Sequence, residues 1–229
     1  MTLFLDLDGT VYDKHNGMWE EMSARIDNYF REVLGLPEEQ ILPTRDRYYA
    51  QYGSTLRGIQ LNYEIDPEDY LAYVHGIDLN KYLSPKPCMR EMLTSLPYPK
   101  WIFTNSDRNH ASRVLKILGI EDLFAGILDV WEMSHIPKPD PRTYRHAIKA
   151  AGNPDPSTCV FVDDTLKNLA PAKAMGWHTV WVDSFTLDPS AEYSIPALKY
   201  LPEVISDIEA ESWVFPLEIH QPQFEDCNY

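Results

Sequence analysis

The sequence predicts an α/β fold in which a doubly wound, mostly parallel sheet carries an inserted helical module. Two observations predict it. Five short apolar runs have the character of buried strands, and helical patterns separate the last four of them. Strands and helices that alternate in this way are joined by right-handed crossovers, which make the strands parallel and place helices on both faces of the sheet.

The predicted elements follow one another in a regular order. Strands are expected at residues 3–7, 101–104, 126–130, 159–162 and 179–182. Helices are expected between the last four strands, at 110–118 and 142–151, and before the fifth, at 166–175. Each of these helical patterns is followed at once by a glycine, which is a helix-stop signal.

Residues 14–96 interrupt this alternation. They contain no convincing strand pattern, and amphipathic helical segments are expected at 18–34, 38–53 and 67–74. A last helix is expected at 196–205, and the final stretch is broken by prolines. We therefore expect a core of residues 1–13 and 97–210, an inserted helical module at 14–96, and a loosely attached tail at 211–229.

The composition excludes several classes of protein. The 35 acidic and 20 basic residues give a net charge of −15, whereas a general nucleic-acid binder would show a basic patch. Three cysteines are too few for a disulfide framework or a zinc site. No apolar run reaches the roughly 18 residues of a membrane span, and the first strand follows Met1 without room for a signal peptide. We expect a cytoplasmic protein, either a monomer or a homodimer.

The strongest chemical signal is the sequence Asp6-Leu7-Asp8-Gly9-Thr10, which ends the first apolar run. Two acids at the end of a buried strand are costly unless they are used, and ligands of open α/β sheets bind at this edge. Gly9 allows a tight turn and lets backbone amides approach an anion. The alternative is that Asp8 or Thr10 caps a turn.

Two acids, Asp163 and Asp164, also end the fourth apolar run. They could bind a hard cation, because Mg²⁺ prefers oxygen ligands and commonly takes one or two carboxylates. The alternative is that Asp164 caps the following helix, and the two roles are compatible.

Two weaker signals lie after the second and third strands. Thr104, Asn105 and Ser106 offer a hydroxyl and amides that suit phosphate oxygens, although such residues are also common turn formers. Lys138 stands between two prolines. A lone lysine is normally solvated, but in a pocket of four acids it would neutralise aspartates and hold a phosphate.

The order of these motifs (DLDGT, then a strand ending in TN, then KP, then a strand ending in DD) resembles that of phosphatases of the haloacid dehalogenase superfamily. All four motifs match in order and frame residues 1–183. The resemblance implies a haloacid dehalogenase-like Rossmannoid core with a helical cap inserted between the first two motifs.

The resemblance also implies a mechanism. Asp6 would attack phosphorus to form an aspartyl-phosphate, and Asp8 would act as general acid and then as general base. Gly9, Thr104, Asn105 and Lys138 would bind the phosphate. Mg²⁺ would be held by Asp6, Asp163 and Asp164, and by the backbone carbonyl of Asp8. A dehalogenase lacks the second acid of the first motif, so a phosphatase or a phosphomutase remains.

The inserted module bears on the substrate. Residues 48–58 (YYAQYGSTLRG) look like the tyrosine-rich signature of the pyrimidine 5′-nucleotidase branch, as do residues 103–111 and 114–120. The fourfold spacing of Tyr48, Tyr52 and Leu56 predicts a packed stripe. Tyr49 and Arg57 lie off that stripe and are candidates for substrate contact. Asn109 is expected at the mouth of the site.

We therefore expect a Mg²⁺-dependent phosphomonoester hydrolase, with a pyrimidine nucleoside monophosphate (UMP or CMP) as its small-molecule substrate. One alternative is another leaving group, such as nicotinamide mononucleotide, a sugar phosphate, phosphoglycolate or a lysophosphatidate. A mutase is less favoured, because it would have to exclude water. A catalytically silent phosphate-binding regulator is also possible in principle, but the intact Asp6 and Asp8 argue against it.

Overall fold

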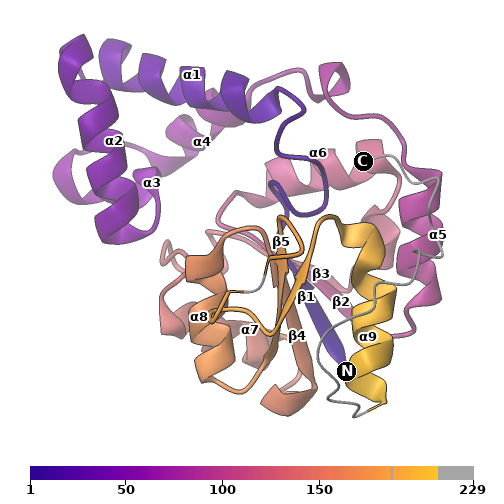
Figure 1. Cartoon of the computed structure of the whole chain (residues 1–229). Helices are drawn as coiled ribbons and strands as arrows, with labels where there is room; N and C mark the ends of the chain where they lie inside the picture. Colours follow the sequence, from indigo (N-terminus) through magenta and orange to yellow (C-terminus); the bar gives the residue numbers. More distant parts are fainter. Residues whose placement is uncertain (187, 211–229) are drawn as a thin grey trace.

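A single six-stranded parallel sheet forms the centre of the protein (Figure 1). The structure is a computed structural model that describes residues 1–186 and 188–210, so the predicted tail at 211–229 lies outside the described residues. The strand order is β3-β2-β1-β4-β5-β6. The strands are β1 (Thr2–Leu5), β2 (Lys100–Phe103), β3 (Gly126–Leu128), β4 (Cys159–Asp163), β5 (His178–Val182) and β6 (Tyr193–Ile195). The predicted α/β fold with a parallel sheet is confirmed.

Strand β1 lies at the centre of this sheet and is buried along its whole length. Its residue Leu3 pairs with Lys100 of β2 on one side and with Val160 of β4 on the other. Asp6 follows the strand, whereas the sequence predicted that the strand would continue to residue 7. The short edge strand β6 was not predicted.

Alternate residues of β1 face two different apolar layers, as the twofold repeat of a strand requires. Leu3 and Leu5 belong to a large cluster that includes side chains of α5, α6 and α9, whereas Phe4 belongs to a second cluster with side chains of α7 and α8. These helices are α5 (Pro87–Ser95), α6 (Arg108–Leu118), α7 (Pro141–Ala150), α8 (Leu166–Ala174) and α9 (Leu201–Glu209). Helices therefore cover both faces of the sheet.

Five α-helices lie between β1 and β2. The first four are α1 (Met18–Glu32), α2 (Glu38–Tyr52), α3 (Thr55–Asn62) and α4 (Pro67–His75). We refer to them as the inserted helices. Figure 1 shows them at the end of the sheet toward which β1 runs from the labelled N-terminus. This is the edge of the sheet at which the sequence predicted the chemistry.

The packing of the inserted helices explains part of the tyrosine-rich segment. Tyr48 is buried and Tyr52 is half-buried on α2, whereas Leu56 is buried in α3, so the predicted stripe is divided between two helices. The Tyr48 ring lies directly against Gly58 of α3. Tyr49 is 47% exposed, off that stripe. Helix α3 was not predicted. Its start is stabilised by Ser54, whose side chain accepts a hydrogen bond from the backbone of Arg57.

Helix α5 was also not predicted. It falls within the predicted module 14–96, yet its buried Met92 and Leu93 belong to the same apolar cluster as β1. Arg90 of this helix forms an ion pair with Asp122, beyond the end of α6. The division of the chain at residue 96 stays a prediction. Within residues 1–186 and 188–210, we find no helix with the length and apolar character needed to cross a membrane.

Candidate active site

Three adjacent strands at the centre of the sheet deliver the candidate residues to one edge. Asp6 follows β1, Asp163 ends β4, and Thr104 follows β2. Because neighbouring parallel strands end at the same edge, these residues meet although they are far apart in the sequence. The loop after β3 adds Lys138, so the four motifs that the sequence singled out are brought together.

Lys138 is almost fully buried, with 1% of its surface exposed. Its Nζ donates three hydrogen bonds of 2.7 Å, to Asp6 Oδ1, Asp163 Oδ2 and the backbone carbonyl of Phe103. Burial alone would lower the lysine pKa, but the charges of Asp163 and Asp6 outweigh it and raise the pKa. The ammonium group is therefore charged, and all three of its donors are used by the protein.

Asp6, Asp163 and Asp164 form a compact acidic cluster. One carboxylate oxygen of each lies within 4.8 Å of the others. Burial raises the pKa of Asp6. The charge of Lys138 opposes this shift, and the neighbouring acids add to it. Burial and Asp163 raise the pKa of Asp164 to about 6.

This cluster fits a hard divalent cation. Three carboxylates carry three negative charges when ionised, and Lys138 offsets one of them at short range. Oxygen donors of this number and spacing suit Mg²⁺. Asp164 does not cap the following helix: the N-cap residue of α8 is Thr165, whose side chain accepts no capping hydrogen bond from the described residues. Asp163 Oδ1 accepts a hydrogen bond of 2.8 Å from the backbone of Thr165, just before the helix.

Asp8 points into a different set of contacts. Its Oδ1 accepts hydrogen bonds from the Tyr12 hydroxyl and from His110 Nε2 (2.9 Å), and its Oδ2 accepts one of 2.6 Å from Ser106 Oγ. Burial would raise the pKa of Asp8, but His110, with help from Ser106 and Tyr12, lowers it well below its usual range. In this arrangement Asp8 is a carboxylate, and its predicted backbone contact with a metal stays a prediction.

Gly9 and Thr10 shape the turn between the two acids of the first motif. Gly9 has a φ of 92°, and a Cβ atom there would lie 2.7 Å from Asp164 Oδ2. Only glycine meets both conditions without strain. The Thr10 hydroxyl accepts a hydrogen bond of 3.0 Å from the backbone of Asp164 and lies 3.4 Å from Asp6 Oδ2.

The side chain of Asn105 holds the lysine loop. Its Oδ1 accepts a hydrogen bond of 2.8 Å from the backbone N–H of Lys138, and its Nδ2 donates one of 3.1 Å to the carbonyl of the same residue. The Thr104 hydroxyl is buried and accepts a hydrogen bond of 3.0 Å from the backbone of Ser106. The predicted phosphate-binding residues thus lie at the site, and Asn105 also positions the lysine.

The three substrate candidates are distributed over three cavities, and Tyr49 borders two of them. Tyr49 borders a cavity of about 410 Å³ together with Asp8, Gly9 and Asp164. Arg57 borders a neighbouring cavity of about 400 Å³, which also contains Tyr49. Asn109 is exposed in a third cavity, between α4 and α6, which contains none of the acids of the first motif. The structure therefore brings Tyr49 to the acids but not Asn109.

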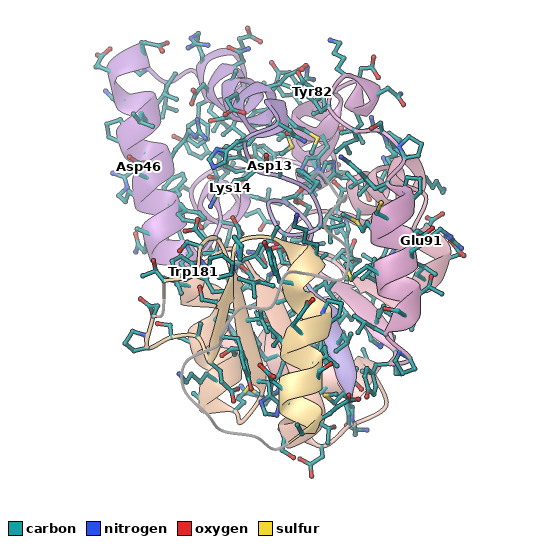
Figure 2. The ribbon with its side chains drawn as sticks, turned by 45° about the vertical axis from the view of Figure 1, so that its right-hand side comes forward. Asp13, Lys14, Asp46, Tyr82, Glu91 and Trp181 are labelled. Atoms are coloured by element: carbon teal, nitrogen blue, oxygen red, sulfur yellow. The ribbon has the colours of Figure 1, made fainter. Side chains whose placement is uncertain are left out.

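Several residues that border the site were not predicted from the sequence. Trp19 of α1 is 52% exposed and borders the Asp8 cavity, as does Lys14. Figure 2 shows Lys14 where the chain leads toward the inserted helices and Trp181 below it, on the sheet. There Lys14 forms an ion pair of 2.7 Å with Asp183, and Trp181 Nε1 donates a hydrogen bond of 2.9 Å to the carbonyl of Asp164. No spacing in the sequence signalled these long-range contacts.

Three curated proteins are similar to this chain in sequence. Phosphate metabolism protein 8 of Saccharomyces cerevisiae is 35% identical over 189 residues, which are 76% of this chain but only 58% of the yeast protein. The chain thus spans less than two thirds of that relative. The phosphoglycolate phosphatase of Neisseria meningitidis is 35% identical over 77% of each chain. The glyceraldehyde 3-phosphate phosphatase of Pyrococcus furiosus is 27% identical over 90% of this chain and 89% of its own.

Solved structures share the fold at lower identity. A HAD phosphatase from Thermococcus onnurineus superposes with a TM-score of 0.61 at 20% identity, covering 89% of this chain and 97% of its own. The L-2-haloacid dehalogenase of Xanthobacter autotrophicus superposes with a TM-score of 0.56 at 17% identity, covering 90% and 98%. The family model of the haloacid dehalogenase-like hydrolases matches residues 1–176. The chain therefore belongs to the haloacid dehalogenase-like hydrolase family and has phosphatases among its relatives.

Proposed function

We propose that this protein is a Mg²⁺-dependent phosphomonoester hydrolase that uses Asp6 as its nucleophile. One observation carries the proposal: Asp6 is held by the buried ammonium group of Lys138 and lies in the same compact cluster as Asp163 and Asp164. A carboxylate in this setting can approach a phosphate, because positive charge offsets the repulsion between them. The relatives named as phosphatases support the same reaction class.

The hydrogen bonds of Asp6 favour one of its two oxygens as the attacking atom. Lys138 holds Oδ1 at 2.7 Å, whereas the one hydrogen bond to Oδ2 from the described residues is the 3.4 Å contact from the Thr10 hydroxyl. Oδ2 is therefore the oxygen that attacks phosphorus. A bond forms between Oδ2 and phosphorus, and the bond from phosphorus to the ester oxygen breaks. Mg²⁺ bound by the three carboxylates would supply the additional positive charge that the phosphate dianion requires.

Asp8 handles the proton in both halves of the reaction. It is ionised in the resting arrangement, and an arriving phosphate dianion would raise its pKa because like charges disfavour ionisation. The protonated Asp8 then gives its proton to the leaving oxygen. In the second half the carboxylate takes a proton from water, which attacks phosphorus and releases phosphate from Asp6.

For the substrate, we propose a pyrimidine nucleoside 5′-monophosphate. The cavity above Asp8 is bordered by two exposed aromatic side chains, Trp19 of α1 and Tyr49 of α2. An aromatic ring can stack on a nucleobase while the phosphate reaches the acids. A second candidate is a small phosphorylated acid or aldehyde, because two of the relatives are named for phosphoglycolate and glyceraldehyde 3-phosphate.

The first test measures phosphate release from UMP, CMP, AMP, GMP, nicotinamide mononucleotide, phosphoglycolate and glyceraldehyde 3-phosphate, with and without Mg²⁺. We expect kcat/KM for UMP and CMP to exceed the others by about tenfold, which corresponds to about 1.4 kcal/mol. A lead by phosphoglycolate or the aldehyde would select the second candidate. Release that is unaffected by chelation would contradict the role of Mg²⁺.

The second test replaces the nucleophile. We expect Asp6→Asn to lower kcat by about 10³-fold or more, because the amide cannot form the covalent intermediate. The matched control is Asp13→Asn, an exposed acid in the turn that accepts a hydrogen bond from the backbone of His15. Retained activity in a folded Asp6→Asn protein would overturn the mechanism.

A further inference from the structure

Two buried histidines stack behind Asp8. His75 is the last residue of α4, one of the inserted helices, and His110 lies in the first turn of α6 in the core. Their ring centroids are 4.3 Å apart, with an angle of 22° between the ring planes. His110 is fully buried and His75 is 9% exposed. The stack therefore joins the inserted helices to the core immediately beside the candidate active site.

The polar contacts of this pair lead to two carboxylates. His110 Nε2 lies 2.9 Å from Asp8 Oδ1, and His75 Nδ1 lies 2.5 Å from Asp107 Oδ2. Because an ionised carboxylate only accepts hydrogen bonds, both of these ring nitrogens carry a proton. Asp107 is itself fixed, since its other oxygen accepts a hydrogen bond of 2.9 Å from the backbone of His110.

The other nitrogen of His110 has no such partner. Its Nδ1 is buried and makes no hydrogen bond within residues 1–186 and 188–210. A buried polar atom without a partner is unfavourable, so its retention calls for an explanation. The hydrogen bond to Asp8 is the one polar contact that the ring makes in the described part of the chain, which points to Asp8 as the reason for a histidine at this position.

The two oxygens of Asp8 are held unequally. Among the residues that the structure describes, Oδ1 accepts hydrogen bonds from both His110 and Tyr12, whereas Oδ2 accepts one from the Ser106 hydroxyl alone. A hydroxyl can rotate and exchange its partner at small cost, but a stacked, buried imidazole cannot. Oδ1 is therefore the anchored oxygen, and Oδ2 is free to exchange Ser106 for the leaving oxygen of a substrate.

This inference rests on the proposed phosphatase function. We propose that His110, supported by the stacked ring of His75, is a positioning residue that anchors Asp8 Oδ1 so that Oδ2 delivers the proton to the leaving oxygen. As the ester bond to phosphorus breaks, the proton on Oδ2 passes to the leaving oxygen. The negative charge left on Asp8 is stabilised by the N–H of His110 and the hydroxyl of Tyr12. Because His75 belongs to the inserted helices, their docking completes the support.

Substrates whose leaving groups differ in basicity can distinguish a positioning role of His110 from a purely structural one. A nitrophenolate leaves without help from an acid, whereas an alkoxide needs the proton, and general acids contribute about 10²-fold to 10⁴-fold. The experiment compares kcat/KM for p-nitrophenyl phosphate with kcat/KM for the alkyl phosphomonoester that the wild type hydrolyses fastest. We expect His110→Leu to lower the alkyl value by about 10²-fold and the aryl value by less than about tenfold.

Two polar variants keep the test valid if the leucine variant does not fold. Gln at position 110 places an amide N–H near the position of Nε2, whereas Asn places it near Nδ1 and does not reach Asp8. His110→Gln should therefore retain most of the alkyl activity that His110→Asn loses. His75→Ala should also lower kcat/KM more for the alkyl ester than for the aryl ester, but by a smaller factor. It should cause no further difference between the two esters in a protein that already carries His110→Leu. The control is His178→Leu, which removes a histidine bonded to Glu192 far from Asp8 in the sheet.

The outcomes are distinct. If the wild type releases no phosphate from any ester, the proposed function fails and the inference falls with it. If the wild type is active but the folded His110 variants slow both esters equally, or neither, the histidines are only structural and the inference alone is overturned. A similar alkyl-specific loss in His178→Leu would also overturn it.

Discussion

The three hydrogen bonds of Lys138 make its replacement the most informative stability experiment. In Lys138→Met the side chain keeps most of its length but loses its charge, so Asp6 and Asp163 remain buried without the cation that separates them. Removing one partner of a buried ion pair costs about 3–5 kcal/mol. That is a large part of the roughly 5–15 kcal/mol by which a domain of this kind is stable. We expect Lys138→Met to lower the free energy of unfolding by about 3–5 kcal/mol in metal-free buffer at pH 8.

The destabilisation caused by Lys138→Met should depend on pH. Burial already raises the pKa of Asp6 above that of the unfolded chain, and the loss of Lys138 raises it further. Asp6 then binds a proton as the pH falls from 8 to 5, and the destabilisation becomes smaller. The assay is the urea dependence of unfolding over this pH range, with chelator present.

Lys100→Met provides the matched control for this experiment. Lys100 is also a buried lysine, but its Nζ donates to two backbone carbonyls, of Leu96 (2.6 Å) and Tyr98 (3.0 Å). Its loss should cost about 1–3 kcal/mol and should not depend on pH over this range. A Lys138→Met protein within about 1 kcal/mol of the wild type, or one with the same pH response as Lys100→Met, would refute the reasoning.

Two further predictions concern regions away from the site. Gly58→Ala should destabilise the protein by about 1–3 kcal/mol in urea unfolding, because the new Cβ would overlap the ring of Tyr48; an unchanged midpoint would show that α2 and α3 can separate freely. Glu192→Gln should cost on the order of 0.5 kcal/mol at pH 6 and less at pH 9. The hydrogen bond from Glu192 raises the pKa of His178, so its contribution is present while the histidine is protonated and is lost as the pH rises through that pKa; equal losses at both pH values would contradict this.

Much of the fold could be predicted because the strands of a parallel sheet are apolar and short. The strand at residues 159–162 is a continuous apolar run, and the structure extends it only to Asp163. Strand β6 was missed because its three residues, Tyr193–Ile195, carry no pattern and gain their strand geometry by pairing with β5. Helix α3 was missed for a related reason: Gly58 lowers its helix propensity but is needed for its packing against α2.

At the site, the sequence identified the residues whose chemistry is unusual in its local setting. Asp6 directly follows one buried strand and Asp163 ends another, and a buried charged group at such a position needs a partner. The role that we propose for His75 could not be predicted from the sequence. It depends on stacking between this ring, at the end of α4, and the ring of His110 in α6. Contacts of this kind arise only when distant segments are placed together.

The central position of β1 bears on how the chain folds during synthesis. β1 is made first, yet both of its neighbours come much later, since Leu3 pairs with Lys100 and Val160. The inserted helices, in contrast, contact one another over short separations in the sequence. Local contacts form sooner than distant ones because less chain entropy is lost. We therefore expect these helices to fold on the ribosome while β1 is still an unpaired apolar segment, and nascent chains to need protection from aggregation until β4 emerges.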